Sequence, residues 1–428
     1  MEALRQRILS HPYYDKALYW FKTISITGLA QIIVQGVGFV TGILIIRLLP
    51  TQEYALYTLA NTMLGTMTVL ADGGISSGVM AQGGKVWQDR EKLGVVLATG
   101  LDLRRKFAVG SLIVSTPILF YLLLHHGASW MTSILIVMSL IPAFYAAISD
   151  SLLEMVPKLN QSIFPLQKNQ VGVGIGRLVL TGLTLFVFPW TFVAIWASGI
   201  PRIYGNIQLR KIAYGFTDRQ QLDPVIRKEI LSMVRRILPG SIYYCLSGQI
   251  ALWLISILGN TTSVAQLGAL GRFAMLLTLL NVWVGTLIIP RFARLSEKKK
   301  VLLERFFQIF ILLFFVLLII VALVYLFSDS ILWILGKNYI GLQNELILSI
   351  IGSCIGLLAG VAFSLFTSRG WVINPVFSIF LSLLSIVVGA LIFNMSSLQG
   401  VLLYNIYLSF FQLLINGGYC LYKIKTTI

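Results

Sequence analysis

Residues 306–327 read FFQIFILLFFVLLIIVALVYLF, a run without a single charged side chain. A helix needs roughly 20 apolar residues to cross the hydrocarbon core of a bilayer. A second uncharged run, ISITGLAQIIVQGVGFVTGILII at residues 24–46, meets the same requirement. Soluble domains rarely contain helices that are this long and apolar on every side. The two stretches therefore predict a protein that spans a membrane.

Ten further apolar segments bring the predicted transmembrane helices to twelve. They cover residues 54–73, 107–124, 131–149, 171–188, 190–209, 238–258, 264–290, 342–366, 373–393 and 399–421. The composition agrees, because 57% of the residues are hydrophobic and only 11% are charged. This balance is typical of a helical membrane bundle and argues against a soluble domain.

The basic residues lie almost entirely on one side of these spans. Of the 33 Lys and Arg residues, Arg47 and Lys337 fall in loops on the other side, and Arg202 and Arg272 fall within spans. Because cytoplasmic loops carry the excess of Lys and Arg, both termini are predicted to be cytoplasmic. The net charge of +17 is dispersed over short loops without interleaved aromatic residues. It therefore indicates orientation and contact with anionic membrane lipids, and no nucleic-acid partner.

The order of the spans predicts two halves with the same orientation. The expected organisation is a cytoplasmic N-terminal segment at 1–22, six helices at 23–209, a basic cytoplasmic connection at 210–236, six helices at 237–421, and a cytoplasmic tail at 422–428. No cleavable signal is expected, since the first residues are polar and basic. Parallel repeats of this kind commonly enclose a substrate path.

One face of the second span is polar. Its residues recur at three- and four-residue steps, which places them in one stripe on a helix: Tyr54, Tyr57, Asn61, Gly65, Thr68 and Asp72. Gln31 and Gln35 extend the pattern into the first span, beside the small-residue pair Gly38 and Gly42. Such a stripe favours either close helix packing or the wall of a water-filled cavity.

Arg272 is the charge that most strongly suggests a binding site. It lies eight residues inside its predicted span, about 12 Å from the end at 1.5 Å per residue. A central arginine costs roughly 2.5–3.5 kcal/mol on insertion scales, and its guanidinium matches phosphate oxygens. We expect either a cavity-facing anion site or an ion pair with an internal carboxylate.

Three other charged residues have two interpretations each. Arg202 and Arg177 lie near the inner ends of their predicted spans, where they could anchor the helix by snorkelling or face a cavity. Asp72 could bind a coupling proton or sodium ion, or end its helix beside Gly73 and Gly74. The sequence does not define the coupling ion.

The cysteines and adjacent histidines are not expected to carry chemistry. Cys245, Cys354 and Cys420 are widely spaced within spans, which favours apolar packing over a disulfide framework or zinc site. His125 and His126 have no carboxylate or cysteine nearby in the sequence. No metal, cofactor or catalytic residue is therefore predicted.

Two patches resemble a known family. Residues 47–57 read RLLPTQEYALY, and LADGG follows at 70–74; a second patch reads LGALGRF at 267–273 and continues through IPRF at 289–292. These patches resemble Wzx-type O-antigen and capsular polysaccharide flippases, in the polysaccharide transporter family of the multidrug/oligosaccharidyl-lipid/polysaccharide exporter (MOP) superfamily. Ala55 stands where the family pattern often has glycine. With twelve spans, the resemblance covers nearly the whole chain.

The resemblance implies an all-α polytopic membrane protein with two six-helix lobes around a central, partly cationic cavity. It implies a non-enzymatic flippase in the bacterial inner membrane that moves a polyprenyl-diphosphate-linked glycan outwards and cooperates with polysaccharide polymerase machinery. The candidate substrate-binding residues are Arg272, Asn61, Tyr57, Thr68, Gln31, Gln35 and Arg47.

The sequence leaves two alternative functions open. A multidrug or other solute exporter of the same superfamily would be favoured by cavity carboxylates, which are scarce in these spans. A membrane glycan polymerase or ligase would need substantial external loops, whereas the longest such loop covers only residues 328–341.

Overall fold

The structure is a computed structural model that describes residues 14–218, 220–293, 295, 298–369, 371 and 373–426. Every regular element within these residues is helical. The first half of the chain contains α2 (Tyr14–Leu48), α3 (Thr51–Asp72), α4 (Ile75–Val86), α5 (Arg90–His125), α6 (Trp130–Leu153), α7 (Met155–Leu159), α8 (Ile163–Val187) and α9 (Thr191–Tyr214).

The second half is also helical but more interrupted. It contains α10 (Pro224–Gly248), α11 (Ile250–Leu258), α12 (Thr261–Ala274), η1 (Met275–Leu277), α13 (Thr278–Trp283), η2 (Val284–Ile288), α14 (Ile289–Ala293), α15 (Lys299–Leu326), α16 (Ser328–Leu335), η3 (Lys337–Tyr339), α17 (Gln343–Thr367), α18 (Pro375–Ile392) and α19 (Leu398–Thr426).

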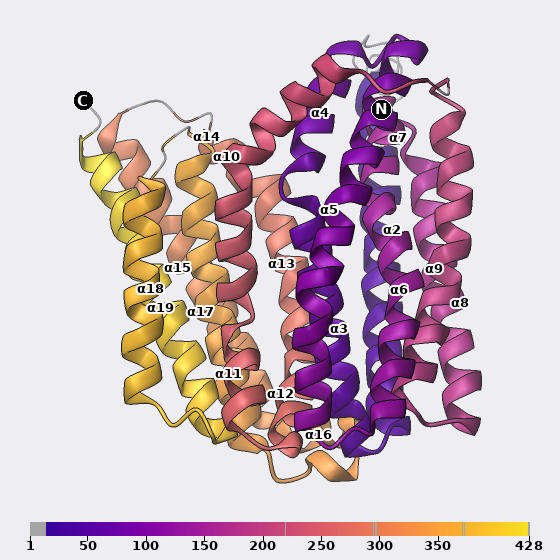
Figure 1. Cartoon of the computed structure of the whole chain (residues 1–428). Coiled ribbons are helices and arrows are strands. Elements are labelled where there is room, and N and C mark those ends of the chain that lie inside the picture. The colour runs from indigo at the N-terminus through magenta and orange to yellow at the C-terminus, as the bar shows by residue number, and fades with distance from the viewer. Residues whose placement is uncertain are drawn as a thin grey trace, which may run out of the picture.

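The helices match the expected transmembrane spans. Within the described residues, eight helical segments are long and apolar enough to cross a membrane. The helices α3, α9 and α18 and the α10–α11 run stand alongside these eight in Figure 1. The all-helical polytopic fold with about twelve spans, predicted from the sequence, is thereby confirmed. The helix α15 contains the opening uncharged run; its most apolar 18-residue stretch has a mean hydropathy of 3.5, and only 11% of that stretch is buried. It is a lipid-facing helix at the periphery.

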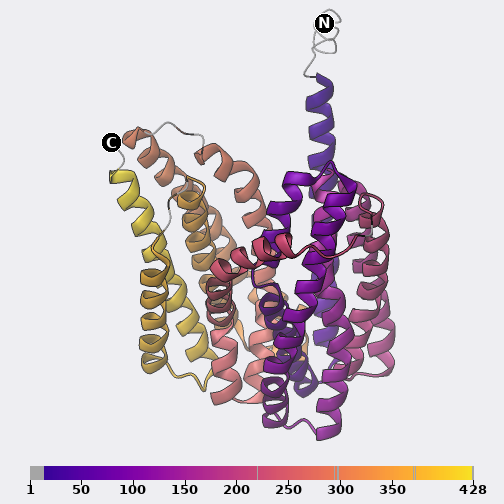
Figure 2. The ribbon, with the colours of Figure 1, turned by 45° about the horizontal axis from the view of Figure 1, so that its top comes forward.

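The helices gather into two lobes (Figures 1 and 2). We call α2–α9 the N lobe and α11–α19 the C lobe. The helix α10 runs between them, and its first half packs on the N lobe, where Ile230 and Val234 share an apolar cluster with Ile75 and Val79. The basic connection expected at 210–236 is therefore largely helical, because α9 continues to Tyr214 and α10 begins at Pro224.

The two ends of the bundle differ. The start of α2 and the end of α19 lie at the same end as α4 and α7, and α16 lies at the other (Figure 1). We call these the basic end and the opposite end. The expected segment 1–22 belongs to α2 from Tyr14 onward, and residues 1–13, 427 and 428 are outside the described residues.

The Gly73–Gly74 pair bends the chain from α3 into α4. Both residues have positive φ, 48° and 96°, a region that glycine adopts without steric penalty. A Cβ on Gly73 would lie 2.8 Å from Leu238 Cδ1, and one on Gly74 would lie 2.8 Å from Ile237 Cβ. The two glycines therefore allow both the turn and the close approach of α10.

The cysteines that the structure describes support the packing interpretation. Cys354 and Cys420 are free and buried. The side chain of Cys245 lies outside the described part of the structure.

Candidate functional site

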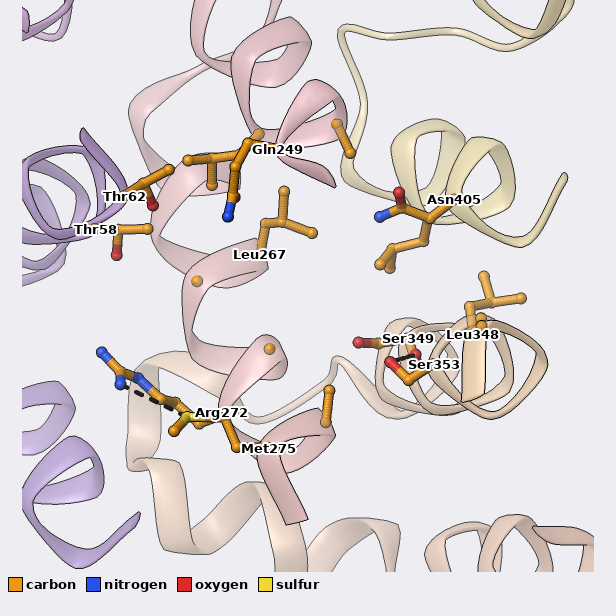
Figure 3. A pocket seen from close by; sticks show the side chains of 18 of the residues that line it. Thr58, Thr62, Gln249, Leu267, Arg272, Met275, Leu348, Ser349, Ser353 and Asn405 are labelled. Carbon is orange, nitrogen blue, oxygen red and sulfur yellow. Dashed lines mark hydrogen bonds between the residues drawn. The ribbon is translucent and has the colours of Figure 1, made fainter. Parts of the chain in front are cut away.

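A cavity of about 430 Å³ lies where α3 of the N lobe faces α11, α12, α17 and α19 of the C lobe. In Figure 3, Thr58 and Thr62 border it from α3, while Ser349, Ser353 and Asn405 border it from the opposite side. Its polar lining consists of Tyr54, Thr58, Asn61, Thr62, Gln249, Arg272, Ser349, Ser353, Asn405 and Ser409. Hydroxyl and amide groups therefore dominate its polar surface.

Two interrupted helices border this cavity. Gln249 separates α10 from α11 and lines the cavity. Arg272 lies in the last turn of α12, which is followed by the 3₁₀ turn η1 and, further on, by the π-helical turn η2. Irregular backbone within a membrane is tolerated where it is enclosed by protein or lines a cavity. Such interruptions are frequent at functional sites of helical proteins.

The Arg272 side chain extends from the C lobe toward the N lobe (Figure 3). It passes close to α2, where a Cβ on Gly42 would lie 3.2 Å from Arg272 Cδ. The guanidinium lies beside Tyr54 and Tyr57 on α3. Its Nη1 also lies 4.0 Å from Met275 Sδ. Among the described residues no carboxylate lies within ion-pair distance of Arg272, so the expected alternative of an internal ion pair is not found there.

Both tyrosines are buried, and Tyr57 lies between Arg272 and Arg177. Tyr57 interacts electrostatically with both arginines. The Tyr54 hydroxyl is buried and makes no hydrogen bond of standard geometry with any described residue. Buried polar groups normally have a partner. The Arg272 guanidinium is the polar group beside this hydroxyl.

Arg177 lies in the middle part of α8. The helix α8 begins at Ile163, so Arg177 is fourteen residues from its start and ten from its end, Val187. At 1.5 Å per residue it is about 15 Å from the nearer end. Its Nε is buried without a hydrogen-bond partner in the described structure. Arg177 therefore lies in the interior of α8, beside Tyr57.

The other candidate substrate-binding residues divide into two groups. Asn61 lines the cavity. Tyr57 is buried outside the lining, beside Arg177 and Arg272. Thr68 donates to the Leu64 carbonyl of its own helix at 2.7 Å. Gln31 donates to Gln170 on α8 at 3.4 Å, and Gln35 is half-buried on α2. Thr68, Gln31 and Gln35 are outside the cavity lining.

Asp72 is paired with an arginine that the sequence analysis did not single out. Arg104, on α5, donates to Asp72 Oδ1, to Ser76 Oγ at 2.8 Å and to Ser151 Oγ at 2.9 Å. The Arg104 side chain is only 2% exposed, and that of Asp72 is 30% exposed. This ion pair joins α3, α4, α5 and α6 within the N lobe and away from the cavity.

Arg202 is also held by an ion pair within the N lobe. Its Nε lies 3.0 Å from Asp150 Oδ2 on α6. Asn206, one turn further along α9, donates to Asp150 Oδ1 at 2.6 Å. Arg202 therefore packs α9 against α6, and it is outside the cavity lining.

Arg47 joins the lobes at the opposite end, outside the cavity lining. Its Nε donates to the Ile334 carbonyl at 2.8 Å and its Nη2 to the Trp333 carbonyl at 2.7 Å. The guanidinium also lies over the Trp333 ring, 5.1 Å from its centroid. A cation at the carboxyl end of a helix is favourable. Arg47 thus connects α2 to the end of α16.

His126 makes a second connection between the lobes at the same end. Its Nε2 lies 2.8 Å from the Ser256 carbonyl and its Nδ1 lies 3.0 Å from Thr261 Oγ1. Burial lowers the pKa of His126, which favours the neutral ring with Nε2 donating and Nδ1 accepting. Together with the bond from Asn338 to Thr51 at 3.2 Å, these contacts hold the opposite end closed.

The C-lobe wall of the cavity was not predicted from the sequence. On α17 the small and polar residues Ser349, Gly352, Ser353 and Gly356 recur at helical spacing, and Asn405 and Ser409 repeat the pattern on α19. Both helices carry the same kind of polar stripe as the second span, and these stripes could have identified them as cavity-lining helices from the sequence.

The comparison of the sequence with family models and with curated proteins gives no match. Solved structures do match the fold. An inward-facing multidrug resistance MATE family transporter of the MOP superfamily superposes with a TM-score of 0.73 at 16% identity, covering 91% of this chain and 94% of the other. The lipid II flippase MurJ, in an inward closed conformation, superposes with a TM-score of 0.72 at 16% sequence identity, covering 94% of this chain and 88% of the other.

The same MATE family is also matched in an outward-facing conformation, with a lower TM-score of 0.57 at 15% identity, covering 95% of this chain and 93% of the other. The chain is therefore a polytopic membrane protein with the fold shared by MATE transporters and MurJ. Within that class, its sequence is distant from each of these neighbours.

Proposed function

We propose that this chain is a flippase that moves a polyprenyl-diphosphate-linked oligosaccharide, a repeat unit of O-antigen, capsule or exopolysaccharide, between the leaflets of a bacterial inner membrane. The observation that carries the proposal is the pair Arg272 and Arg177. They come from different lobes, interact with the same Tyr57, and have no carboxylate within ion-pair distance in the described structure. Arg272 lines the cavity and Arg177 lies beside Tyr57 outside the lining, so Arg272 would contact the diphosphate directly and Arg177 would add positive charge nearby.

The cavity supplies partners for the rest of the headgroup. Sugar hydroxyls and phosphates cannot enter hydrocarbon without losing the water that solvates them. Asn61, Ser349 and Asn405 present amide and hydroxyl groups to the cavity, and these groups can replace that water. The polyprenyl tail would remain in the bilayer beside the lobes.

The proposed mechanism is alternating access between the two lobes. The contacts of Arg47 and His126 close the opposite end, and the better match to the inward-facing MATE structure supports an inward-facing state. We assign the basic end to the cytoplasm from its Lys and Arg content. An inside-negative potential would then favour outward movement of an anion by about 2.3 kcal/mol per charge per 100 mV.

A multidrug exporter is the second candidate, since a MATE family transporter is among the similar structures. Cationic drugs are complemented by carboxylates, but none lines the described cavity and Arg272 is its charged residue. A glycan polymerase is disfavoured because α16 and η3 fill the segment between α15 and α17. A polymerase would be a partner that consumes the flipped product.

Gly42→Leu is expected to reduce transport about tenfold. Overpacking costs about 1–2 kcal/mol, and a cost of that size corresponds to roughly a tenfold loss. The new side chain would occupy the space that Arg272 crosses, since a Cβ alone lies 3.2 Å from Arg272 Cδ. A Cβ on Gly38, one turn earlier, would have no described atom within 4 Å. Gly38→Leu is the control and should retain transport. Equal activity of both variants would contradict the assigned position of Arg272.

Arg47→Ala is expected to open the opposite end more often. The change removes two hydrogen bonds to the end of α16 and the contact with the Trp333 ring. The measurement is labelling of Asn61→Cys, a cavity position, by an impermeant thiol reagent added outside cells. Labelling should rise about fivefold or more, because losing contacts worth roughly 1 kcal/mol shifts the equilibrium toward the open form by that factor. Unchanged labelling would show that Arg47 does not control this end.

Cells lacking this protein provide the test of function. We expect lipid-linked oligosaccharide to accumulate, shielded from an impermeant sugar-modifying probe, and surface polysaccharide to disappear. Complementation with the wild-type chain should restore both. Normal glycan export in its absence, combined with greater sensitivity to cationic drugs, would favour the exporter.

A further inference from the structure

A second cavity lies on the flank of the N lobe at the basic end. It has a volume of about 510 Å³ and is bounded by the first turns of α5, the last turns of α9 and the connection that follows α9. Its size is within the range of ordinary small-molecule sites. It has no lining residue in common with the central cavity.

The cationic lining of this flank cavity comes mainly from α9. Arg210 and Lys211 line it together with Tyr214. Arg210 also lines a small adjoining recess between α5 and α6, where Arg105 and Tyr145 are its neighbours. Among the described residues, Arg105 and Lys211 are thus the unpaired basic neighbours of Arg210, whereas Arg104, which also lines the recess, is paired with Asp72.

These cations are not neutralised by the protein. In the part of the chain that the structure describes, Arg105, Arg210 and Lys211 have no carboxylate within ion-pair distance. Asp218, the acidic residue of the lining, is 3.8 Å from Arg90. Arg210 Nε donates to Asn206 Oδ1 at 3.0 Å, which orients its guanidinium. The flank cavity therefore carries a net positive charge.

Apolar side chains continue from the cations toward the middle of the bundle. On α9, Ile207, Tyr204 and Ile200 repeat at three- and four-residue steps and are 50%, 64% and 48% exposed. On the neighbouring α6, Tyr145 and Ile141 are 48% and 40% exposed. Side chains at this spacing lie on one helix face. The outer surface thus combines a cationic head with an apolar track and flanking tyrosines, which favour the membrane interface.

We propose that this flank cavity is a binding site for an anionic glycerophospholipid of the surrounding leaflet. Arg105, Arg210 and Lys211 would contact the phosphate and the charged headgroup, and the α6 and α9 track would contact the acyl chains. Basic pockets between membrane helices bind anionic headgroups in this way. A soluble phosphate would use the cations but leave the track uncovered. The site is independent of the proposed transport function.

The test is lipid binding by the purified full-length chain, measured by native mass spectrometry during titration with phosphatidylglycerol and phosphatidylcholine of identical acyl chains. The wild type should bind phosphatidylglycerol at least about tenfold more tightly than phosphatidylcholine, because each basic residue near an anionic headgroup contributes roughly fivefold in affinity. The double variant Arg105→Gln/Lys211→Gln should lose most of this preference. Both residues are exposed, so the fold should tolerate the change.

The matched control is Arg227→Gln/Lys228→Gln, which removes the same charge from exposed positions of α10 at the same end. It should keep the wild-type preference. Equal loss in both double variants, or equal binding of the two lipids by the wild type, would overturn the proposal. Displacement of phosphatidylglycerol by millimolar glycerol 3-phosphate would also overturn it, because the site would then recognise a free phosphate.

Discussion

Replacing Arg272 by glutamine is expected to reduce translocation of a diphosphate-linked glycan about ten- to a hundredfold. Hydrogen bonds to charged groups contribute roughly 1.5–3 kcal/mol each, and the variant loses the charge while keeping much of the side-chain length. Arg272 lines the cavity and interacts with Tyr54 and Tyr57. The measurement is the initial rate of translocation in reconstituted vesicles containing equal amounts of folded protein.

Two further variants separate charge from geometry and from general effects. Arg272→Lys keeps the charge but loses the planar fork that matches phosphate oxygens, so its rate should be intermediate. Arg227→Gln makes the same chemical change at an exposed position of α10 and should be neutral. A fully active Arg272→Gln protein would remove the main support for an anionic substrate.

Asp72→Asn is expected to destabilise the N lobe by about 2–3 kcal/mol. Removing one partner of a buried ion pair costs roughly 3–5 kcal/mol, and the 30% exposure of the Asp72 side chain reduces that figure through solvent screening. The loss arises because Arg104, only 2% exposed, would remain charged without its carboxylate. The measurement is the free energy of unfolding of the purified protein in detergent.

A surface ion pair and a double variant control this prediction. Asp102→Asn removes the carboxylate that lies 2.7 Å from the exposed Lys106 and should cost at most about 0.5 kcal/mol. Asp72→Asn/Arg104→Met should be more stable than Asp72→Asn, because no buried charge is left unpaired. If Asp72→Asn keeps full stability but transport loses its dependence on protons or sodium, Asp72 acts in ion coupling instead.

The fold could be predicted because hydropathy is a local property. Uninterrupted apolar runs located the spans, and the distribution of Lys and Arg separated the two ends of the bundle. The breaks at Gln249 and after Arg272 were not predicted, since each depends on the cavity that several distant helices form together. Segment 163–170 was also omitted from the fifth span, because its polar residues lower the hydropathy although the helix begins at Ile163.

The candidate site was predictable only in part, because charge compensation depends on distant residues. Arg104 belongs to the basic run Arg104-Arg105-Lys106 and so resembled a solvated loop. Its burial is explained by Asp72 on another helix. Arg47 was assigned to the cavity from its motif, but its partners Trp333 and Ile334 lie far along the chain. In contrast, Arg272, Tyr54 and Asn61 were singled out from depth and spacing alone, and all three line the cavity; Tyr57 of the same stripe lies beside Arg272 outside the lining.

Translocation by the purified protein tests the proposed function most directly. The wild-type chain and Arg272→Gln would be reconstituted into separate vesicles containing fluorescent polyprenyl-diphosphate-linked oligosaccharide, and an impermeant probe would report the glycan that reaches the outer leaflet. The wild type should expose glycan faster than protein-free vesicles, and Arg272→Gln should be about ten- to a hundredfold slower. Wild-type vesicles that match the protein-free ones, but that transport a cationic dye, would contradict the flippase and identify an exporter.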